Sequence, residues 1–521
     1  MTSMNETERQ DNRQVILREA NRLVERVEQA YEQGEAVHEL ERGLFAQLLR
    51  MGHQLLELFF ELCGAGDRGA QLELDEGRRV KRLERRHGRA YCSVFGEHQL
   101  ERVVYGTREG QKIAYVPLDS QLQLPASQFS YLRQEWDQAL AVEQSYAQVR
   151  ETLERMLGIR QSVPSLERIN QQLSGSVDAF WSAREPAPVA QGEEMVVGSA
   201  DGKGVVMRRG AVTEVAANAA TGAEAAAAEA EPGGKKMALI GAVYTIEPYI
   251  RTPEQVLKAL FEPSPLTEAK PPPRPKPLNN YVRASLARDA QDTMAPSYAD
   301  IFLWLAQEQR QRNPTGQHPV VVLMDGQKSL WTRAELAFAE VAHVEVLDLL
   351  HALGYLWDAA ELFYPSLSHG PCSADVKQQR LVFVKHQTEG LLNGQVQTVM
   401  RRLCVRMDTL NTTQRQTLDD IVGYFRNNAS RMQYDQYLQA GYPIASGVIE
   451  GACRHIVCDR MERSGMRWLM PGAKAMLALR CISINQEWEA FMAFHIAREN
   501  QRLYPGCAAN DDRFLPDQLI A

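Results

Sequence analysis

The sequence predicts an α/β protein in which a strand-containing middle region lies between two long helical regions. Apolar side chains recur at helical spacing over residues 13–62, and a helical pattern returns from about 373 to 500. Between them, 195–207, 237–246 and 319–324 are continuous apolar runs, which are typical of buried strands. At 521 residues and 44% hydrophobic content, the chain exceeds one ordinary core, so two to four domains are expected.

The amino-terminal third divides into two regions. Residues 1–66 form a helical region with a break at Gly34, and this pair of helices either packs internally or mediates dimerisation. Residues 67–182 combine a small β-structure at about 88–119 with helices at 143–157 and 164–173. Gly158 in the connecting turn, Ser162 as cap and Pro164 in the first turn favour a helix-turn-helix, although helical hairpins are common in any α-rich region.

A basic run precedes the β-structure. It suits a DNA backbone, and the alternative is a solvated basic face. Its candidate DNA-binding residues are Arg78, Arg79, Lys81, Arg82, Arg85, Arg86 and Arg89.

Two acids follow apolar runs in the middle region. Asp201 interrupts one strand pattern and Asp325 ends another, and both are followed by glycine, so that the backbone is expected to turn away and expose the carboxylate. The alternative is that Asp-Gly is simply a good turn. A third acid, Glu450, follows Ser446 and Gly447 and is expected in the first turn of a helix. Three such carboxylates could hold two Mg²⁺ (or Mn²⁺) ions about 4 Å apart for attack on a phosphodiester.

Several neighbouring residues could support that chemistry. Asp348 and His351 would share a helix face near the crevice expected where the strands end. Arg454 lies one helical turn after Glu450. Arg467 could contact the scissile strand, as could Arg460, Arg463 and Lys474, and surface salt bridges are the alternative for all of these cations. Trp468 is either a core residue or a platform that stacks an unpaired base.

Net charge, the lengths of the apolar stretches and the cysteine spacing argue for or against several other classes of protein. The net charge of −8 would argue against a nucleic-acid binder if charge were evenly spread, and no stretch approaches the roughly 20 apolar residues of a membrane span. The eight cysteines include no Cys-x-x-Cys pair, which argues against a disulfide framework and a structural zinc site. We read Cys453 and Cys458 as packing residues. The expected location is cytoplasmic, in association with the nucleoid, without a membrane partner.

The chain resembles bacterial insertion-sequence transposases of the DDE class, closest to the Kra-type group and more distantly the Mutator-like transposases. The resemblance covers most of residues 90–495. It rests on Ser199-Ala-Asp201-Gly-Lys-Gly-Val205, Leu323-Met-Asp325-Gly, Asp348-Leu-Leu-His351, the run from Ser446-Gly-Val-Ile-Glu450 to Trp468, and Pro471-Gly-Ala-Lys-Ala-Met-Leu-Ala-Leu-Arg480.

The resemblance implies an RNase H-like catalytic core interrupted by a helical insertion and preceded by mostly helical DNA-binding and dimerisation regions. Asp201, Asp325 and Glu450 would be the catalytic, metal-binding acids, and Asp348 is the replacement for Asp325 if one member is wrong. Two departures are an Ala/Glu-rich stretch at 211–236 and the lack of a zinc-type Cys cluster near the amino terminus. The implied segments are a first part of the core at 183–372 with a Pro-rich connector at 263–280, the insertion at 373–440, a last part of the core at 441–500, and a tail at 501–521.

The implied activity is binding of terminal inverted repeats, metal-dependent cleavage at the element ends and transfer of 3′ ends to target DNA. Double-stranded DNA is therefore the expected partner, and a homodimer or higher homo-oligomer is expected because two ends must be held together. Two alternatives stay open. One is a catalytically silent DNA-binding regulator that keeps the fold, and the other is a structure-selective RNase H-like nuclease.

Overall fold

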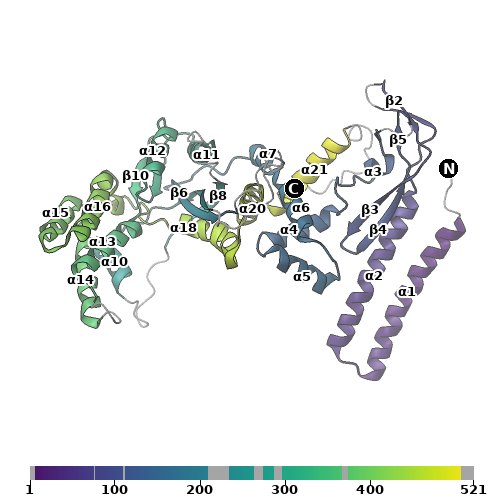
Figure 1. Cartoon of the computed structure of the whole chain (residues 1–521), viewed down its shortest axis with the longest axis horizontal. Coiled ribbons are helices and arrows are strands. Elements are labelled where there is room, and N and C mark those ends of the chain that lie inside the picture. The colour runs from purple at the N-terminus through teal and green to yellow at the C-terminus, as the bar shows by residue number, and fades with distance from the viewer. Residues whose placement is uncertain are drawn as a thin grey trace, which may run out of the picture. The chain divides into compact units, whose positions relative to one another are not determined.

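The computed structural model describes residues 6–74, 77–108, 112–208, 234–262, 274–286, 296–366 and 373–505. Within it the chain forms two compact units. The first contains residues 1–180 and 487–521, and the second contains residues 181–486. Helix α21 therefore belongs with the amino-terminal unit, so the expected last part of the core, 441–500, ends in the second unit at Gln486. Figure 1 shows the elements of both units.

The first unit is mostly helical, as expected, and carries small antiparallel sheets. Its helices are α1 (Glu6–Gln33), α2 (Val37–Cys63), α3 (Pro117–Gln121), α4 (Tyr131–Ala141), α5 (Tyr146–Leu157), α6 (Val163–Ser174), α7 (Val177–Ala183, which crosses the unit boundary) and α21 (Trp488–Leu503). Its strands are β1 (Gln71–Glu73), β2 (Arg79–Arg82), β3 (His87–Ser93), β4 (Gly96–Arg102) and β5 (Tyr105–Gly106). Strand β2 lies between β1 and β5, and β3 pairs with β4.

Helices α5 and α6 form a helical hairpin with the expected turn chemistry. Gly158 adopts a left-handed conformation after α5, and the Ser162 side chain accepts a hydrogen bond from the Ser165 N–H at the start of α6. Helix α5 begins at Tyr146 and not at Glu143, because Ser145 forms a capping box with Gln148. Helix α4 packs against both helices.

The second unit is built on one mixed sheet. Its strands are β6 (Met195–Val206), β7 (Lys235–Ile246), β8 (Leu278–Leu286), β9 (Val320–Met324) and β10 (Val344–Leu347), in the order β10-β9-β6-β7-β8. Strands β10, β9 and β6 are parallel, whereas β7 is antiparallel to both β6 and β8. The helices are α10 (Pro253–Phe261), α11 (Pro296–Arg312), α12 (Lys328–Ala337), α13 (Leu349–Phe363), α14 (Ala374–Leu392), α15 (Val396–Val405), α16 (Thr412–Asn428), α17 (Tyr434–Gln439), α18 (Gly447–Cys453), α19 (Asp459–Met461) and α20 (Met470–Ile484).

Both faces of the sheet are covered by helices (Figure 1). Because side chains alternate along β6, Val196 and Ala200 face α11 and α12, whereas Met195 and Val197 face the core that includes α13 to α17. A sheet covered on both faces explains why the strands read as continuous apolar runs. The observed class is therefore α/β, as predicted.

Strand β8 was not predicted. It begins at Leu278, inside the expected Pro-rich connector of 263–280, of which residues 263–273 lie outside the described residues. Most of the Ala/Glu-rich stretch at 211–236 also lies outside the described residues, and its last two residues, Lys235 and Lys236, already belong to β7.

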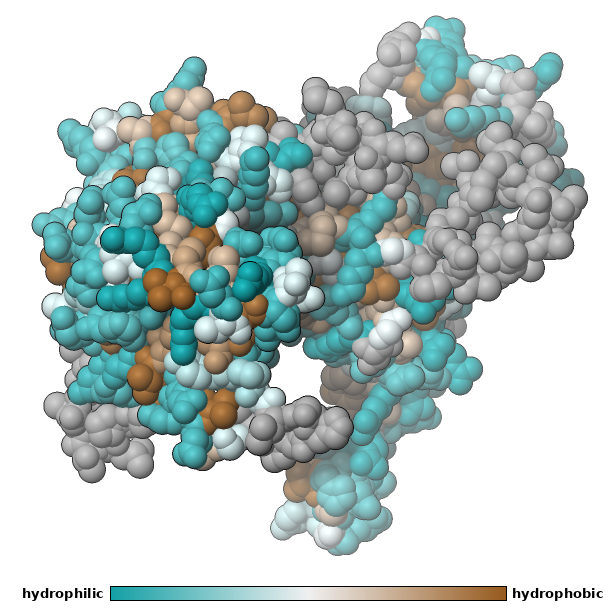
Figure 2. Space-filling view, turned by 60° about the vertical axis from the view of Figure 1, so that its left-hand side comes forward, coloured by the Kyte–Doolittle hydropathy of each residue, from teal (hydrophilic) through white to brown (hydrophobic). Residues whose placement is uncertain are grey.

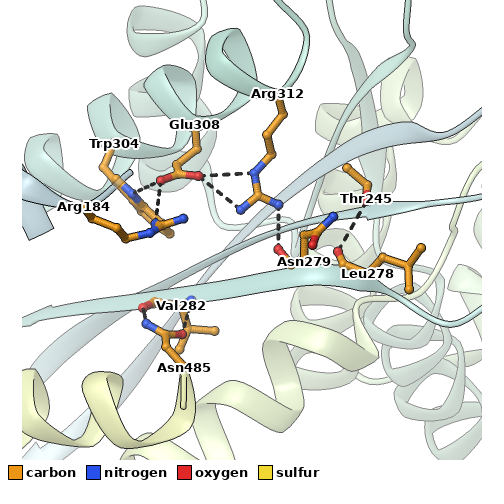
Figure 3. Close-up of polar contacts among 9 residues, drawn as sticks. All are labelled: Arg184, Thr245, Leu278, Asn279, Val282, Trp304, Glu308, Arg312 and Asn485. Atoms are coloured by element: carbon orange, nitrogen blue, oxygen red, sulfur yellow. Dashed lines mark hydrogen bonds and ion pairs between the residues drawn. The ribbon is translucent and has the colours of Figure 1, made fainter. Parts of the chain in front are cut away.

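A buried ionic network joins α11 to the edge of the sheet (Figure 3). The Glu308 carboxylate accepts hydrogen bonds from the Arg312 and Arg184 side chains at 3.1–3.2 Å and from Trp304 Nε1 at 3.2 Å. Arg312 also donates to the Asn279 carbonyl at 2.7 Å, and Asn485 exchanges two hydrogen bonds with the Val282 backbone. These bonds fix β8 against α11 and against the end of α20.

Among the described residues, no helix is both long and apolar enough to cross a membrane. Figure 2 shows a largely hydrophilic surface on which the apolar side chains form small, separate groups.

Candidate functional site

Three aspartates, here called the row, lie beyond the paired segments of the parallel strands. Asp201 is the fourth residue after Val197, and Asp325 is the fourth after Val321, which pairs with Val197. On the other side of β9, Leu347 pairs with Met324, and the N–H of Asp348 bonds to the Met324 carbonyl at 2.9 Å. Residues that are level on adjacent parallel strands lie close together. Asp325 and Asp348 therefore leave the sheet side by side, whereas Asp201 lies three residues beyond Gly198, the last β6 residue that pairs with β9; the charges of Asp201 and Asp348 both act on Asp325.

The row lies beyond the last residues that pair β6 with β9. Pairing between β6 and β9 ends at Gly198, whereas β6 continues to Val206 through its pairing with β7. Asp201 is therefore inside a strand and not at its end, and Gly202 pairs with Leu239 in place of the expected turn. By alternation, Asp201 faces the same side as Val197.

Helix α18 packs against β6 and β7 and brings Glu450 to this region. Glu450 lies in the first turn of α18, as predicted, and is exposed. Ser446 precedes the helix but does not cap it with its side chain, because its hydroxyl donates to Asp348 Oδ2. Cys453, one turn after Glu450, places Sγ 3.4 Å from Asp201 Oδ2.

Asp348 is the most strongly bonded acid of the row. It is completely buried, and its Oδ1 caps α13 by accepting a 2.7 Å hydrogen bond from the Leu350 N–H. Its Oδ2 accepts the Ser446 N–H at 3.0 Å and lies 3.5 Å from His351 Nδ1. Burial alone would raise the pKa of Asp348, but the bonds from His351, Ser446 and Leu350 hold it below its ordinary value.

His351 supplies a positive charge among these acids. Its bond to Asp348 raises its pKa to about 9 against the opposing effect of burial, and Asp325 and Asp201 contribute in the same direction. The imidazole is therefore cationic at neutral pH. Burial raises the pKa of Asp325, a bond from the Gln327 N–H opposes this, and the charges of Asp201 and Asp348 add to the rise.

The closest potential ligand atoms belong to Asp348, His351 and Glu450, which lie within 4.8 Å of one another. This grouping differs from the expected set of Asp201, Asp325 and Glu450. Asp201 Oδ1 instead accepts the Gly202 N–H at 2.6 Å, and Asp325 Oδ1 accepts the Gln327 N–H at 3.1 Å. The carboxylate oxygens are nevertheless hard donors that suit Mg²⁺ or Mn²⁺.

Tyr424 is a neighbour of the site that sequence reasoning missed. Its ring lies so close to Gly326 that a Cβ at residue 326 would approach it to 2.1 Å, and it stacks on Tyr355 with ring centroids 3.8 Å apart. Glycine at residue 326 therefore does more than allow a turn, because any larger side chain there would collide with the Tyr424 ring. Burial, Tyr355 and Asp325 all raise the pKa of the Tyr424 hydroxyl. Tyr424 belongs to α16, about a hundred residues after Asp325, so no local sequence signal connects them.

Cys453 was read only as a packing residue. It is buried, and desolvation raises the pKa of its thiol, which keeps the thiol protonated beside Asp201. The spacing of Glu450 and Cys453, three residues apart on a helix, was the available signal that both face one region.

The other candidate residues, which follow Glu450 in the chain, differ in how exposed their side chains are. The Arg454 side chain is 76% exposed and lies 3.8 Å from Asp459, and Arg467 is also exposed. Arg460 is instead buried, with its guanidinium 5.1 Å from the ring of Trp468. Trp468 is 8% exposed and donates from Nε1 to the Met461 carbonyl at 3.0 Å, so its ring is part of the core and is not open for stacking by a base.

The basic run begins at the residue before β2 and continues through β2 and the β2–β3 connection into β3, in the first unit. Arg78, Arg79, Lys81, Arg82, Arg85 and Arg86 are exposed. Arg82 bonds to Asp67, and Arg79 lies 3.5 Å from Glu73. Arg89 departs from the prediction, because it donates to Asp119 at 2.8 Å and to the carbonyls of Pro125 and Ser127, which makes it a structural residue.

A comparison with models of known protein families gave no match, and a comparison with curated proteins gave none either.

Proposed function

We propose that the chain is a DDE-class transposase that cleaves DNA at the terminal inverted repeats of its own element and joins the 3′ ends to target DNA. One observation carries the proposal. Asp201 and Asp325 follow paired positions on adjacent parallel strands and their charges interact, and α18, which packs on β6 and β7, carries Glu450. Two acids from a sheet and a third from a helix suit a two-metal site for phosphoryl transfer.

The same proposal assigns the sheet to an RNase H-like core. Support comes from the strand order β10-β9-β6-β7-β8, in which an antiparallel set is extended by parallel strands at β6. This order brings Asp201 and Asp325 together although 123 residues separate them in the sequence. Helices α14 to α17 would be the insertion that precedes the third acid.

The side chains have separable roles in this mechanism. Bound Mg²⁺ or Mn²⁺ would activate a water or 3′-hydroxyl and offset charge on the leaving oxygen. Asp201, Asp325 and Glu450 would bind the ions. Asp348 positions the site, because it bonds to the first turn of α13 and to the start of α18. His351, whose Nδ1 lies 3.5 Å from Asp348 Oδ2, would help to hold that carboxylate in place.

DNA recognition and pairing are assigned to the first unit. The exposed Arg78, Lys81, Arg85 and Arg86 would contact phosphates, and the α5–α6 hairpin would act as the helix-turn-helix. The α1–α2 hairpin has several exposed large apolar side chains, including Phe45, Leu48, Leu55, Phe59 and Leu62, which support its assignment to dimerisation.

The test is cleavage of double-stranded DNA that carries the element ends, in Mg²⁺ or Mn²⁺. Asp201→Asn, Asp325→Asn and Glu450→Gln should each lower the cleavage rate by at least about 10²–10³-fold, the effect of losing one group that stabilises the transition state. DNA binding should remain close to wild type. Asp358→Asn, an exposed acid on α13, is the matched control and should cut normally.

The possible results separate the three functions. A fully active Asp201→Asn, Asp325→Asn or Glu450→Gln variant would remove that residue from the proposed set. Wild-type protein that binds the ends but never cuts them with metal present would support the regulator. Cleavage of branched DNA without any requirement for end sequences would support the structure-selective nuclease.

A further inference from the structure

The α1–α2 hairpin carries more apolar side chains than the packing of its two helices on each other uses. The helices run antiparallel and lie side by side (Figure 1). Partly or fully buried apolar residues recur every seven positions and form the side on which each helix meets the other. They are Ile16, Leu23 and Ala30 on α1 and Leu44, Met51 and Leu58 on α2. The large apolar side chains that stay exposed therefore need another explanation.

These exposed side chains also recur at heptad spacing. On α1 they are Leu17, Val24, Val27 and Tyr31. On α2 they are Phe45, Leu48, Leu55, Phe59 and Leu62. Separations of three, four or seven residues place each set in one stripe along its helix, which is the pattern of a helix-bundle or coiled-coil interface.

Both stripes lie on the same side of the hairpin. On each helix the stripe follows the inner residues by one position, as Leu17 follows Ile16 and Phe59 follows Leu58. One position is a turn of about 100° around the helix axis. Because the two helices are antiparallel and face each other, equal turns along the chain bring both stripes to one side. We call the two stripes together the exposed face.

The β3–β4 hairpin packs on another side of α2 and leaves the exposed face open. His98 of β4 contacts Glu57 at 3.0 Å and meets the ring of Phe60 with centroids 5.4 Å apart. Phe95, at the tip of the β3–β4 hairpin, lies beside Gly52, where a Cβ would approach its ring to 2.5 Å. Phe95 is itself 42% exposed. Its ring therefore continues the apolar surface at the stripe position where Gly52 has no side chain.

The area and charge of the exposed face indicate what kind of partner covers it. Its nine large apolar side chains are 44–88% exposed. They offer on the order of 900 Å², and a stable interface buries about 800 Å² per partner. Residues 6–63 contain twelve Asp or Glu and seven Arg and no Lys, a net charge of −5, which disfavours DNA and an anionic lipid surface. Two helices with one shared apolar side are half of a four-helix bundle, and a second copy supplies the other half.

We propose that two copies of the chain associate through their exposed faces into a four-helix bundle in which the hairpins run head to tail. The proposal specifies the partner and geometry of the dimer assigned to this hairpin above. It rests on that part of the proposed function and is independent of catalysis. A two-fold axis relates the copies, so each residue of the interface contributes twice.

Charged residues at the start of each stripe favour the head-to-tail arrangement. Arg13 precedes Leu17 by four residues, Glu41 precedes Phe45 by four residues, and both charged side chains are exposed. Arg13 lies toward the open end of the hairpin, whereas Glu41 lies close to the turn between the helices. Head-to-tail pairing brings Arg13 of each copy to the end that carries Glu41 of the other. Pairing with both turns at one end would instead place like charges at the same level.

The test is sedimentation equilibrium of the full-length chain without DNA or metal. The wild-type chain should be a dimer at micromolar concentrations. Val24→Glu and Leu48→Glu should each weaken the dimer by at least about 100-fold, because each charge enters the apolar interface twice. Val15→Glu and Ala46→Glu are the matched controls, since these exposed positions lie outside the stripes of the same two helices, and both should dimerise as the wild type does. Circular dichroism should show the same helical content in all four variants.

A charge exchange tests the orientation. Arg13→Glu and Glu41→Arg should each weaken the dimer by about 10-fold, and the double variant should restore it. A double variant weaker than either single one would overturn the head-to-tail arrangement. A wild-type chain that is monomeric at about 100 μM, or a dimer that Val24→Glu and Leu48→Glu leave intact, would overturn the interface itself. A chain that dimerises as described but never cuts DNA would support this interface and count against the catalytic part of the proposed function.

Discussion

Replacing Asp348 by asparagine should destabilise the second unit, whereas Glu450→Gln should not. Asparagine can still cap α13, because its oxygen can accept the Leu350 N–H. Its amide group would then face the buried Ser446 N–H, which now bonds to Oδ2 at 3.0 Å. One unsatisfied buried donor costs about 1–3 kcal/mol, and the charge-assisted bond from the Ser446 hydroxyl is also weakened. The expected loss is about 3 kcal/mol.

Glu450 is the matched case because its side chain is exposed. Substitutions at such positions usually change the free energy of unfolding by within about 0.5 kcal/mol. The assay is hydrogen exchange without metal, followed by mass spectrometry of peptides that cover 344–353 and 441–450. Faster exchange is expected in Asp348→Asn, while Glu450→Gln should exchange at the wild-type rate and lose only cleavage. Unchanged protection in Asp348→Asn would refute the assigned structural role of this acid.

Three further perturbations test other parts of the structure. Gly326→Ala should destabilise the second unit by about 1–3 kcal/mol, because the added methyl group clashes with Tyr424. In a double-mutant cycle, Tyr424→Ala should relieve part of that loss, and strictly additive effects would contradict the contact. Glu308→Gln should cost about 3–5 kcal/mol in urea unfolding, because it leaves the buried Arg312 and the half-buried Arg184 without their acid, and a near-neutral effect would refute this. Burial raises the pKa of Asp137 to about 6 from 3.8. The stability of the first unit should therefore fall by about 3 kcal/mol as pH rises from about 4 to 6. Asp137→Asn should flatten this dependence of stability on pH, and an unchanged slope would contradict the assignment.

The sequence predicted the central strands well because both faces of the sheet are buried. Residues 195–206, 235–246 and 320–324 are largely continuous apolar runs, and a sheet covered by helices requires that pattern. Strand β8 carries Asn279, Asn280 and Arg283, so it does not show this pattern. Arg283 is accommodated because its guanidinium lies over the rings of Trp181 and Trp304, at 4.6 and 4.9 Å from their centroids. Those partners are distant in the sequence and could not be inferred from it.

The sequence placed Glu450 correctly in the first turn of a helix, but it did not predict the local geometry of Asp201 and Asp325. Asp-Gly was read as a turn at both acids, whereas Gly202 continues β6 and Gly326 makes room for a tyrosine from α16. The difference arises from pairing with β7 and from packing of a distant helix, and both are tertiary effects. For the same reason, Arg89 and Arg460 looked like DNA contacts in a basic sequence, although the fold uses one in an ion pair and buries the other.

Asp348 also explains how a large helical segment can separate the acids without displacing Glu450. The chain leaves the sheet at Asp348, forms α13 to α17, and returns at Ile444, whose carbonyl accepts the Leu349 N–H at 2.9 Å. Two residues later, Ser446 bonds to the Asp348 carboxylate. The entry and exit of this segment are therefore joined at one point, immediately before the helix that carries Glu450. Because the entropy of closing a loop grows only slowly with its length, the segment can be long at little further cost while Glu450 stays beside the sheet.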